Sequence, residues 1–211
     1  MHRKINNGII TASLCAALVV IGSPFASSTD PATADPATPT PRASSVVLTT
    51  PTEGTVSHNY QVQKTFYWCS AAAARIALST HDVSVKQSTL AKYMDVSRDG
   101  GLPNLNNLRD AMNKYSKDGG YELRQWKNET TLRQQLTKDV ISNVDSGHAV
   151  IINVTRIDKA KFSGGHYATI VGYRDGGNEF KIADPADSSR DAIWLSAKNV
   201  ADGVKLNRYV A

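Results

Sequence analysis

One cysteine stands at a position suited to nucleophilic chemistry. The stretch QKTFYWCSAAAARIAL, residues 63–78, places Cys69 directly before a run of small residues that favours a helix. A thiol attacks as its thiolate, and the positive end of a helix dipole or a nearby imidazolium lowers its pKa. By position Cys69 has the first of these. It is therefore a candidate nucleophile, with a buried and inert thiol as the alternative.

The second requirement is an imidazole, and four histidines follow residue 28. His58 precedes the predicted domain and His81 follows the far end of the cysteine helix, so both are expected to be solvated surface groups. His148 lies where a helix gives way to a strand, and we expect it to serve packing.

His166 is the better candidate, because it ends the glycine-rich segment KFSGGH and begins the strand-like segment YATIVGY. The next apolar run ends in IADP, and the turn between them contains DGG, a hairpin signal. Residues near the open end of a hairpin can lie side by side, so Asp184 could orient His166 as the third member of a triad. The alternative for Asp184 is an Asx turn before Pro185.

Acyl transfer also needs hydrogen-bond donors for the oxyanion. The backbone N–H of Cys69 at the helix start is one. A side-chain amide is the expected second, and Gln63 lies six residues before the cysteine, with Gln61 as a competitor.

The chain resembles the papain-like cysteine peptidases over residues 60–200. The resemblance rests on the order of a glutamine, a cysteine at a helix start, the segment GGHYATIVGY and the segment IADP. Within these peptidases the chain is most similar to the bacteriocin-processing, double-glycine peptidase-like group. The resemblance implies Cys69 as nucleophile, His166 as general base and acid, Asp184 as its orienter and Gln63 as oxyanion donor. It also implies a cleft between a helical half and a sheet half.

The chain departs from this family in two respects. Members often read Cys-Gly-Pro at the nucleophile, whereas this chain reads Cys69-Ser70-Ala71. The members that process leader peptides are fused to an export ATPase, and this chain shows no Walker-type loop of such an ATPase. A stand-alone exported peptidase is therefore expected. The alternatives are a papain-like cell-wall amidase or endopeptidase, although WCSA lacks the Asp and Gly usual in such motifs, and a catalytically inert binding domain.

The elements that must position these residues follow from periodicity. Helices are predicted over residues 69–79, 84–94 and 105–117, the third capped by Asn104, and from Thr130 or Thr131 to Gly147. Strands are predicted over 121–126, 148–154, 166–174 and 178–185, with AIWL and LNRYV as closing strands. The segment 155–165 is expected to be a loop that forms a wall of the cleft and moves. Helices first and an antiparallel sheet second predict an α+β, papain-like fold.

The N-terminal residues indicate export. A basic start, an apolar run from Gly8 to Gly22 and small residues after Pro24 predict a signal peptide over 1–28, with cleavage as late as 34. Residues 29–55, rich in Pro, Ala, Thr and Ser, predict a disordered linker, and 56–211 the peptidase domain. Cleavage removes Cys15 and leaves Cys69 as the single cysteine of a secreted, bacterial protein.

Composition restricts the partners. The chain has 24 Lys and Arg against 19 Asp and Glu, and loss of Arg3 and Lys4 leaves 22 basic residues and a net charge of +3 without a basic run. Nucleic acid is therefore not an expected partner. We expect a peptide or protein substrate, no membrane association after signal cleavage, and a monomer. One cysteine and scattered histidines give no metal-ligand spacing, so no metal or other cofactor is expected.

Overall fold

The computed structural model describes residues 51–211, so the predicted signal peptide and the linker up to residue 50 lie outside the described residues. The helices are α1 (Cys69–Ser79), α2 (Gln87–Tyr93), α3 (Leu105–Tyr115), α4 (Glu129–Asp145) and α5 (Ala197–Gly203). The strands are β1 (Gly54–Thr55), β2 (Leu123–Gln125), β3 (Val150–Ile157), β4 (Ala160–Arg174), β5 (Glu179–Ala183), β6 (Ile193–Ser196) and β7 (Val204–Val210), and the 3-10 turn η1 (Asp175–Gly177) joins β4 to β5.

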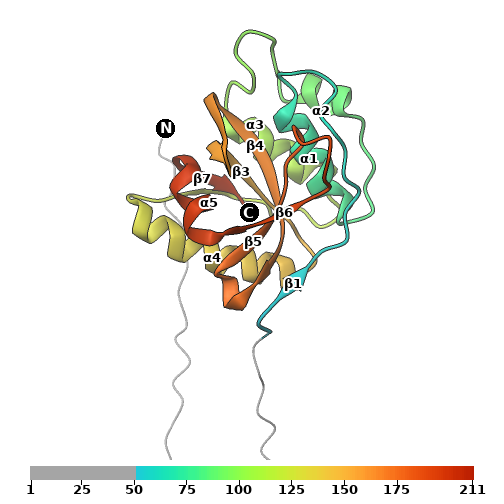
Figure 1. Cartoon of the computed structure of the whole chain (residues 1–211). Coiled ribbons are helices and arrows are strands. Elements are labelled where there is room, and N and C mark those ends of the chain that lie inside the picture. The colour runs from blue at the N-terminus through green and yellow to red at the C-terminus, as the bar shows by residue number, and fades with distance from the viewer. Residues whose placement is uncertain (1–50) are drawn as a thin grey trace, which may run out of the picture. The chain divides into compact units, whose positions relative to one another are not determined.

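The strands form one antiparallel sheet in the order β2-β7-β3-β4-β5-β6, and β1 pairs with β4 beside this path. Helices α1, α2 and α3 contact one another and lie together to one side of β3 and β4, while α4 and α5 form a second helical layer (Figure 1). The predicted α+β class with a helical half and an antiparallel sheet half is confirmed.

The alanine run explains how closely the two halves meet. Ala71 to Ala74 have no exposed surface, and Thr169 Oγ1 of β4 donates a hydrogen bond of 3.0 Å to the carbonyl of Ala73. A strand side chain reaches the helix backbone only where the helix residues are small. Helix α1 is therefore a buried helix packed on β4, and its first residue is held at a defined place against the sheet.

Most predicted elements are observed, with ends that differ by a few residues. Helix α1 begins and ends as predicted, and the Asn104 side chain accepts a hydrogen bond from the N–H of Asn106 at the start of α3. Helix α4 begins at Glu129, one residue before the earlier predicted start, because the Asn128 side chain caps it by accepting from the N–H of Thr131. Helix α5 was not predicted.

Two segments expected to be irregular are paired strands. Gly54 and Thr55, assigned to the linker, form β1 opposite Tyr173 and Gly172. The predicted loop 155–165 instead extends the β3–β4 hairpin to the pair Ile157 and Ala160, and the prediction of an unstructured loop is wrong. The two-residue turn between them requires positive φ, which Asp158 adopts at 50°.

Within residues 51–211 no helix combines the length and the apolar character needed to cross a membrane.

Candidate active site

Cys69 is the first residue of α1, and the start of this helix has no side-chain cap, because Trp68 occupies the N-cap position. Burial by itself raises the pKa of the half-buried Cys69 thiol. The hydrogen bond and positive charge of His166, together with the backbone N–H groups of Tyr167 and Ser70, outweigh burial. The pKa of Cys69 therefore lies below its ordinary value, which favours the thiolate.

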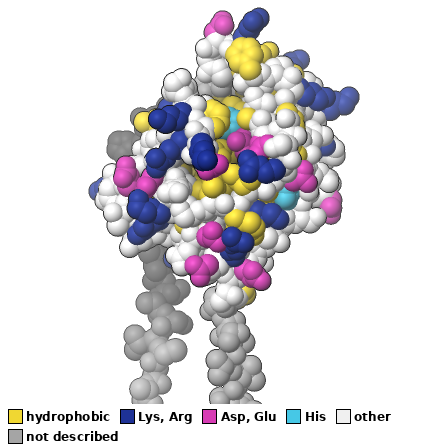
Figure 2. Space-filling view, viewed as in Figure 1, with side chains coloured by type: hydrophobic (Ala, Val, Ile, Leu, Met, Phe, Trp, Pro, Cys, Tyr) yellow, Lys and Arg dark blue, Asp and Glu magenta, His cyan; other side chains and the backbone are white. Residues whose placement is uncertain are grey.

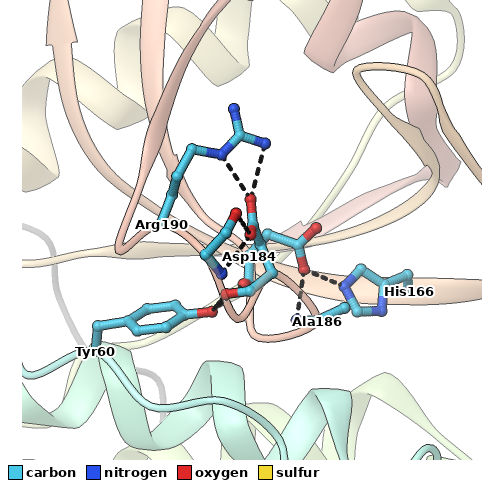
Figure 3. A network of polar contacts seen from close by, with 7 residues as sticks. Tyr60, His166, Asp184, Ala186 and Arg190 are labelled. Carbon is cyan, nitrogen blue, oxygen red and sulfur yellow. Dashed lines mark hydrogen bonds and ion pairs between the residues drawn. The ribbon is translucent and has the colours of Figure 1, made fainter.

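His166 lies on β4 and Asp184 follows β5, and the hairpin brings the two side chains together. His166 Nε2 is 2.6 Å from Asp184 Oδ1, and the side chains are 5% and 12% exposed (Figure 3). This contact leaves Nδ1 of the imidazole for Cys69. Burial alone lowers the pKa of His166, but the hydrogen bonds and charges of Asp184 and Cys69 raise it to about 9.

Asp184 also forms the local turn that its sequence suggests. Its Oδ1 accepts a second hydrogen bond, of 2.9 Å, from the N–H of Ala186. The two interpretations of Asp184, an Asx turn and a partner for His166, are thus both present in one carboxylate. The turn holds the carboxylate at the edge of the sheet, so that it cannot rotate away from the imidazole without losing a backbone hydrogen bond.

Two aromatic residues that the sequence did not indicate support this pair. The Phe162 ring stacks on the imidazole of His166 with a centroid separation of 4.2 Å and an interplanar angle of 17°. Tyr60 Oη donates to the carbonyl of Asp184 at 2.6 Å and also contacts the carbonyl of Asp187 (Figure 3). Tyr60 meets Asp184 only through the tertiary fold, whereas Phe162 lies four residues before His166 on β4, where the strand places both rings on one face.

The two candidate oxyanion amides have different surroundings. Gln61 Oε1 accepts from Gln87 Nε2 at 3.3 Å. Gln63 Nε2 donates to the carbonyl of Thr65 at 3.0 Å, and the backbone N–H of Gln63 donates to the carbonyl of Pro185 at 2.9 Å. Gln63 is thus tied to the turn that follows Asp184, whereas Gln61 is tied to α2.

Gln87 on α2 organises the glutamine segment. Its buried side chain accepts from the N–H of Lys64 at 3.0 Å and donates to the carbonyl of Val62 at 2.9 Å. These contacts fix the backbone on both sides of Gln63. The residue lies within the second helix predicted from the sequence, but nothing in that helix pattern indicates its inward contacts.

Two pockets reach residues of this region. One, of about 390 Å³, is lined by Phe162 and Asp184 with Lys159 and Arg190 at its border. The other, of about 350 Å³, is lined by Tyr167 with Asn153, Lys205 and Arg208. In the face seen in Figure 2, a hollow with hydrophobic side chains and a histidine is bordered by basic and acidic side chains.

Two other groups of residues, the remaining histidines and the aromatic residues before Cys69, have different surroundings. His81 is not a solvated group, because its side chain is only 6% exposed and packs edge to face against His148, so that prediction is wrong. Of the aromatic residues before Cys69, Trp68 packs against the core, whereas Phe66 is 71% exposed with the guanidinium of Arg98 near its ring.

Solved structures with a similar fold include three proteases or peptidase domains. A double glycine motif protease from an AMS/PCAT transporter, in complex with the leader peptide, has a TM-score of 0.52 at 19% identity, covering 74% of this chain and 91% of that one. The peptidase domain of Streptococcus ComA, a bifunctional ABC transporter, has a TM-score of 0.50 at 17% identity, covering 72% and 97%. A putative C39-like peptidase from Bacillus anthracis has a TM-score of 0.52 at 12% identity, covering 75% and 96%.

No curated protein matches the chain. The model of the Peptidase_C39 like family, by contrast, matches residues 56–207, which include the helix of Cys69 and the hairpin of His166 and Asp184. The predicted relation to double-glycine peptidases of papain-like fold is confirmed: the chain belongs to the Peptidase_C39 like family and is a cysteine-type peptidase.

Proposed function

We propose that the protein is an exported peptidase that hydrolyses peptide bonds through Cys69, His166 and Asp184, with Gln63 as oxyanion donor. The observation that carries this proposal is the pair of contacts made by one imidazole. Its Nε2 is held by Asp184 at 2.6 Å, and its proximity to Cys69 lowers the pKa of the thiol. A thiolate and an imidazolium can therefore coexist at neutral pH.

In the first half of the reaction the Cys69 thiolate attacks the scissile carbonyl carbon and a C–S bond forms. The backbone N–H of Cys69 and the second N–H of the Gln63 amide donate to the resulting oxyanion. As the tetrahedral intermediate collapses, the C–N bond breaks and the leaving amine takes a proton from His166 Nδ1. The product is a thioester acyl-enzyme.

In the second half, neutral His166 accepts a proton from water as the water oxygen attacks the thioester carbon. The C–S bond then breaks, the acid product leaves, and the thiolate and imidazolium are restored. Throughout, Asp184 accepts from His166 Nε2–H and holds the ring plane, which keeps Nδ1 directed at the sulfur.

The proposed substrate class is peptide or protein. A double glycine motif protease with this fold was solved in complex with a leader peptide, and in this chain the pockets beside His166 and Tyr167 combine apolar and polar lining residues. Such mixed surfaces suit an extended peptide with several side chains.

Alkylation of Cys69 tests the proposed chemistry. The protein should react with iodoacetamide at pH values well below the free-thiol pKa of about 8.5, and His166→Ala should no longer react at those pH values. His58→Ala is the matched control, because the ring of His58 hydrogen-bonds to the nearby carbonyl of Val56, and this variant should react like the parent. If the parent and His166→Ala react alike, and only at alkaline pH, that result would falsify the catalytic assignment. Casein or peptide libraries tested against purified peptidoglycan then distinguish a peptidase from a cell-wall amidase.

Export has its own test. The basic start and the apolar run from Gly8 to Gly22 support a signal peptide. Expressed in a bacterium, the protein should accumulate outside the cytoplasm with a mature N-terminus after residue 28 or residue 34, as read by mass spectrometry of the intact chain. Retention in the cytoplasm with residues 1–28 still present contradicts the proposal.

A further inference from the structure

Three metal-ligand side chains meet at the end of α1 remote from Cys69. His81 Nδ1 lies 3.6 Å from Asp118 Oδ2, and ligand atoms of these two residues and of His148 all lie within 4.8 Å of one another. His81 is twelve residues after Cys69, which corresponds to about 18 Å along a helix. This cluster is therefore separate from the catalytic pair.

Hydrogen bonds occupy one nitrogen of each imidazole and leave the other as a possible metal ligand. His148 Nδ1 lies 2.9 Å from the carbonyl of Ser146, which can only accept, so Nδ1 carries the proton and Nε2 keeps its lone pair. His81 Nε2 contacts the hydroxyl of Tyr121 at 3.3 Å, which leaves Nδ1 facing Asp118. A ligating histidine in metalloproteins usually has such a partner on its other nitrogen.

The cluster also lies where negative electrostatic potential accumulates. Each of the three residues lies within three positions after the end of a helix: His81 follows α1, Asp118 follows α3 and His148 follows α4. The C-terminal end of a helix carries partial negative charge, which favours a cation and disfavours a carboxylate alone.

We propose that His81 Nδ1, Asp118 and His148 Nε2 bind one divalent transition-metal ion of the zinc type. Two imidazoles and a carboxylate form a donor set that Zn²⁺ accepts, with a fourth position for water. Tetrahedral bonds of about 2.0–2.1 Å place ligand atoms about 3.3 Å apart, close to the 3.6 Å between His81 and Asp118. His148 reaches the same geometry through a side-chain movement of at most about 1.5 Å, given the 4.8 Å limit.

The site is accessible and joins elements that are distant in the sequence. A pocket of about 190 Å³, lined by His148 and Tyr121 among others, opens beside the cluster and can admit the ion and its water. A bound ion would connect the segment after α1, the turn after α3 and the junction of α4 with β3. Its expected role is structural, because it clamps the helices against the sheet.

Metal binding can be measured without the catalytic thiol. The full chain carrying Cys15→Ser and Cys69→Ser, without a histidine tag, should bind one Zn²⁺ in calorimetry with a Kd on the order of 1 µM. Co²⁺ should give the visible absorption of a low-coordinate complex. At one hundred times Kd, Zn²⁺ should raise the melting temperature by about 5 °C or more.

Two partly exposed ligands provide the variants, since changing buried His81 could disturb folding. In the same background, His148→Gln should weaken Zn²⁺ binding at least 100-fold and Asp118→Asn at least 10-fold, and both should lose the thermal shift. His58→Gln and Asp99→Asn are matched controls distant from the cluster in the sequence and should bind like the parent. Equal Zn²⁺ affinity of the parent and His148→Gln, or no saturable binding up to about 100 µM, overturns the proposal. Because Cys69→Ser abolishes the proposed peptidase chemistry, this result is independent of catalysis.

Discussion

Asp184 shows how one side chain can combine a local and a long-range role. Its Oδ1 accepts from the N–H of Ala186 in the turn and from the imidazole of His166 across the hairpin. These two contacts hold the carboxylate beside the ring, where its hydrogen bond and its charge favour the imidazolium. Against the effect of burial, Asp184 and Cys69 raise the pKa of His166, and His166 with two backbone N–H groups lowers the pKa of Cys69, so the imidazole links the two shifts.

The pH dependence of kcat/KM should reflect both groups. Activity should rise as the Cys69 thiol loses its proton, below the free-thiol pKa of about 8.5. It should fall as His166 loses its proton near pH 9, because neutral imidazole cannot protonate the leaving amine. In Asp184→Ala the alkaline limb should move to lower pH, since the main group that raises the His166 pKa is gone. An unmoved alkaline limb in that variant contradicts the role given to Asp184.

Among the elements, α1 and α2 position the nucleophile and the glutamine segment by different means. Helix α1 uses small residues to approach β4, which fixes Cys69 opposite His166. Helix α2 uses one buried amide, Gln87, to hold the backbone at Val62 and Lys64. Gln63 lies between these two residues, so the proposed oxyanion donor depends on a helix that contributes no group to the proposed chemistry itself.

Replacing Gln87 with Met should expose this dependence. The change keeps the volume but removes its hydrogen bonds to Val62 and Lys64, which should lower the free energy of unfolding by about 1–3 kcal/mol. We expect kcat to fall several-fold while the alkylation rate of Cys69, which needs no oxyanion donor, stays near that of the parent. Ser88→Ala, at the neighbouring exposed position of α2, is the control. A parallel loss in kcat and alkylation would show a general disturbance instead.

At the scale of the whole molecule, the segment before α1 joins the two halves. β1 pairs with β4, Val56 donates its N–H to the carbonyl of Val171, and Gln63 donates to the carbonyl of Pro185. Tyr60 adds the contact with the carbonyls of Asp184 and Asp187. Burial, and then the charges of the nearby aspartates, raises the pKa of Tyr60 to about 12, so its hydroxyl keeps its proton and continues to donate.

Tyr60→Phe tests this connection. Loss of the hydroxyl removes a donor from two carbonyls, of which that of Asp184 still accepts from the N–H of Asp187. We expect the free energy of unfolding to fall by about 1 kcal/mol in urea denaturation. kcat should fall with little change in KM, because the turn that carries Asp184 loses an anchor. Tyr93→Phe, whose ring is 41% exposed on α2, is the matched control and should leave both quantities unchanged. Unchanged kcat in Tyr60→Phe means that the turn is held without it.

The sequence predicted the α+β order, helix α1 to the residue, and the contact of His166 with Asp184, because these follow from local patterns. A helix, a hairpin and a strand-end aspartate each depend on neighbours along the chain. It did not predict that residues 155–165 continue the hairpin, because their Gly-rich composition suits a loop as well as a strand. Nor did it indicate Tyr60 or Gln87, whose partners are distant along the chain. The stacking of Phe162 on His166 was missed because it requires residues 160–165 to be a strand and not a loop.

Residue types and local spacing thus predicted the cysteine-peptidase class of this protein, and they supply the candidate nucleophile and its imidazole. Only the tertiary structure decided which glutamine is tied to the turn after Asp184, and which histidines are buried. The clearest case is the cluster of His81, Asp118 and His148. Each follows a different helix, so no spacing along the chain relates them, and only the packing of three helix ends brings their ligand atoms together.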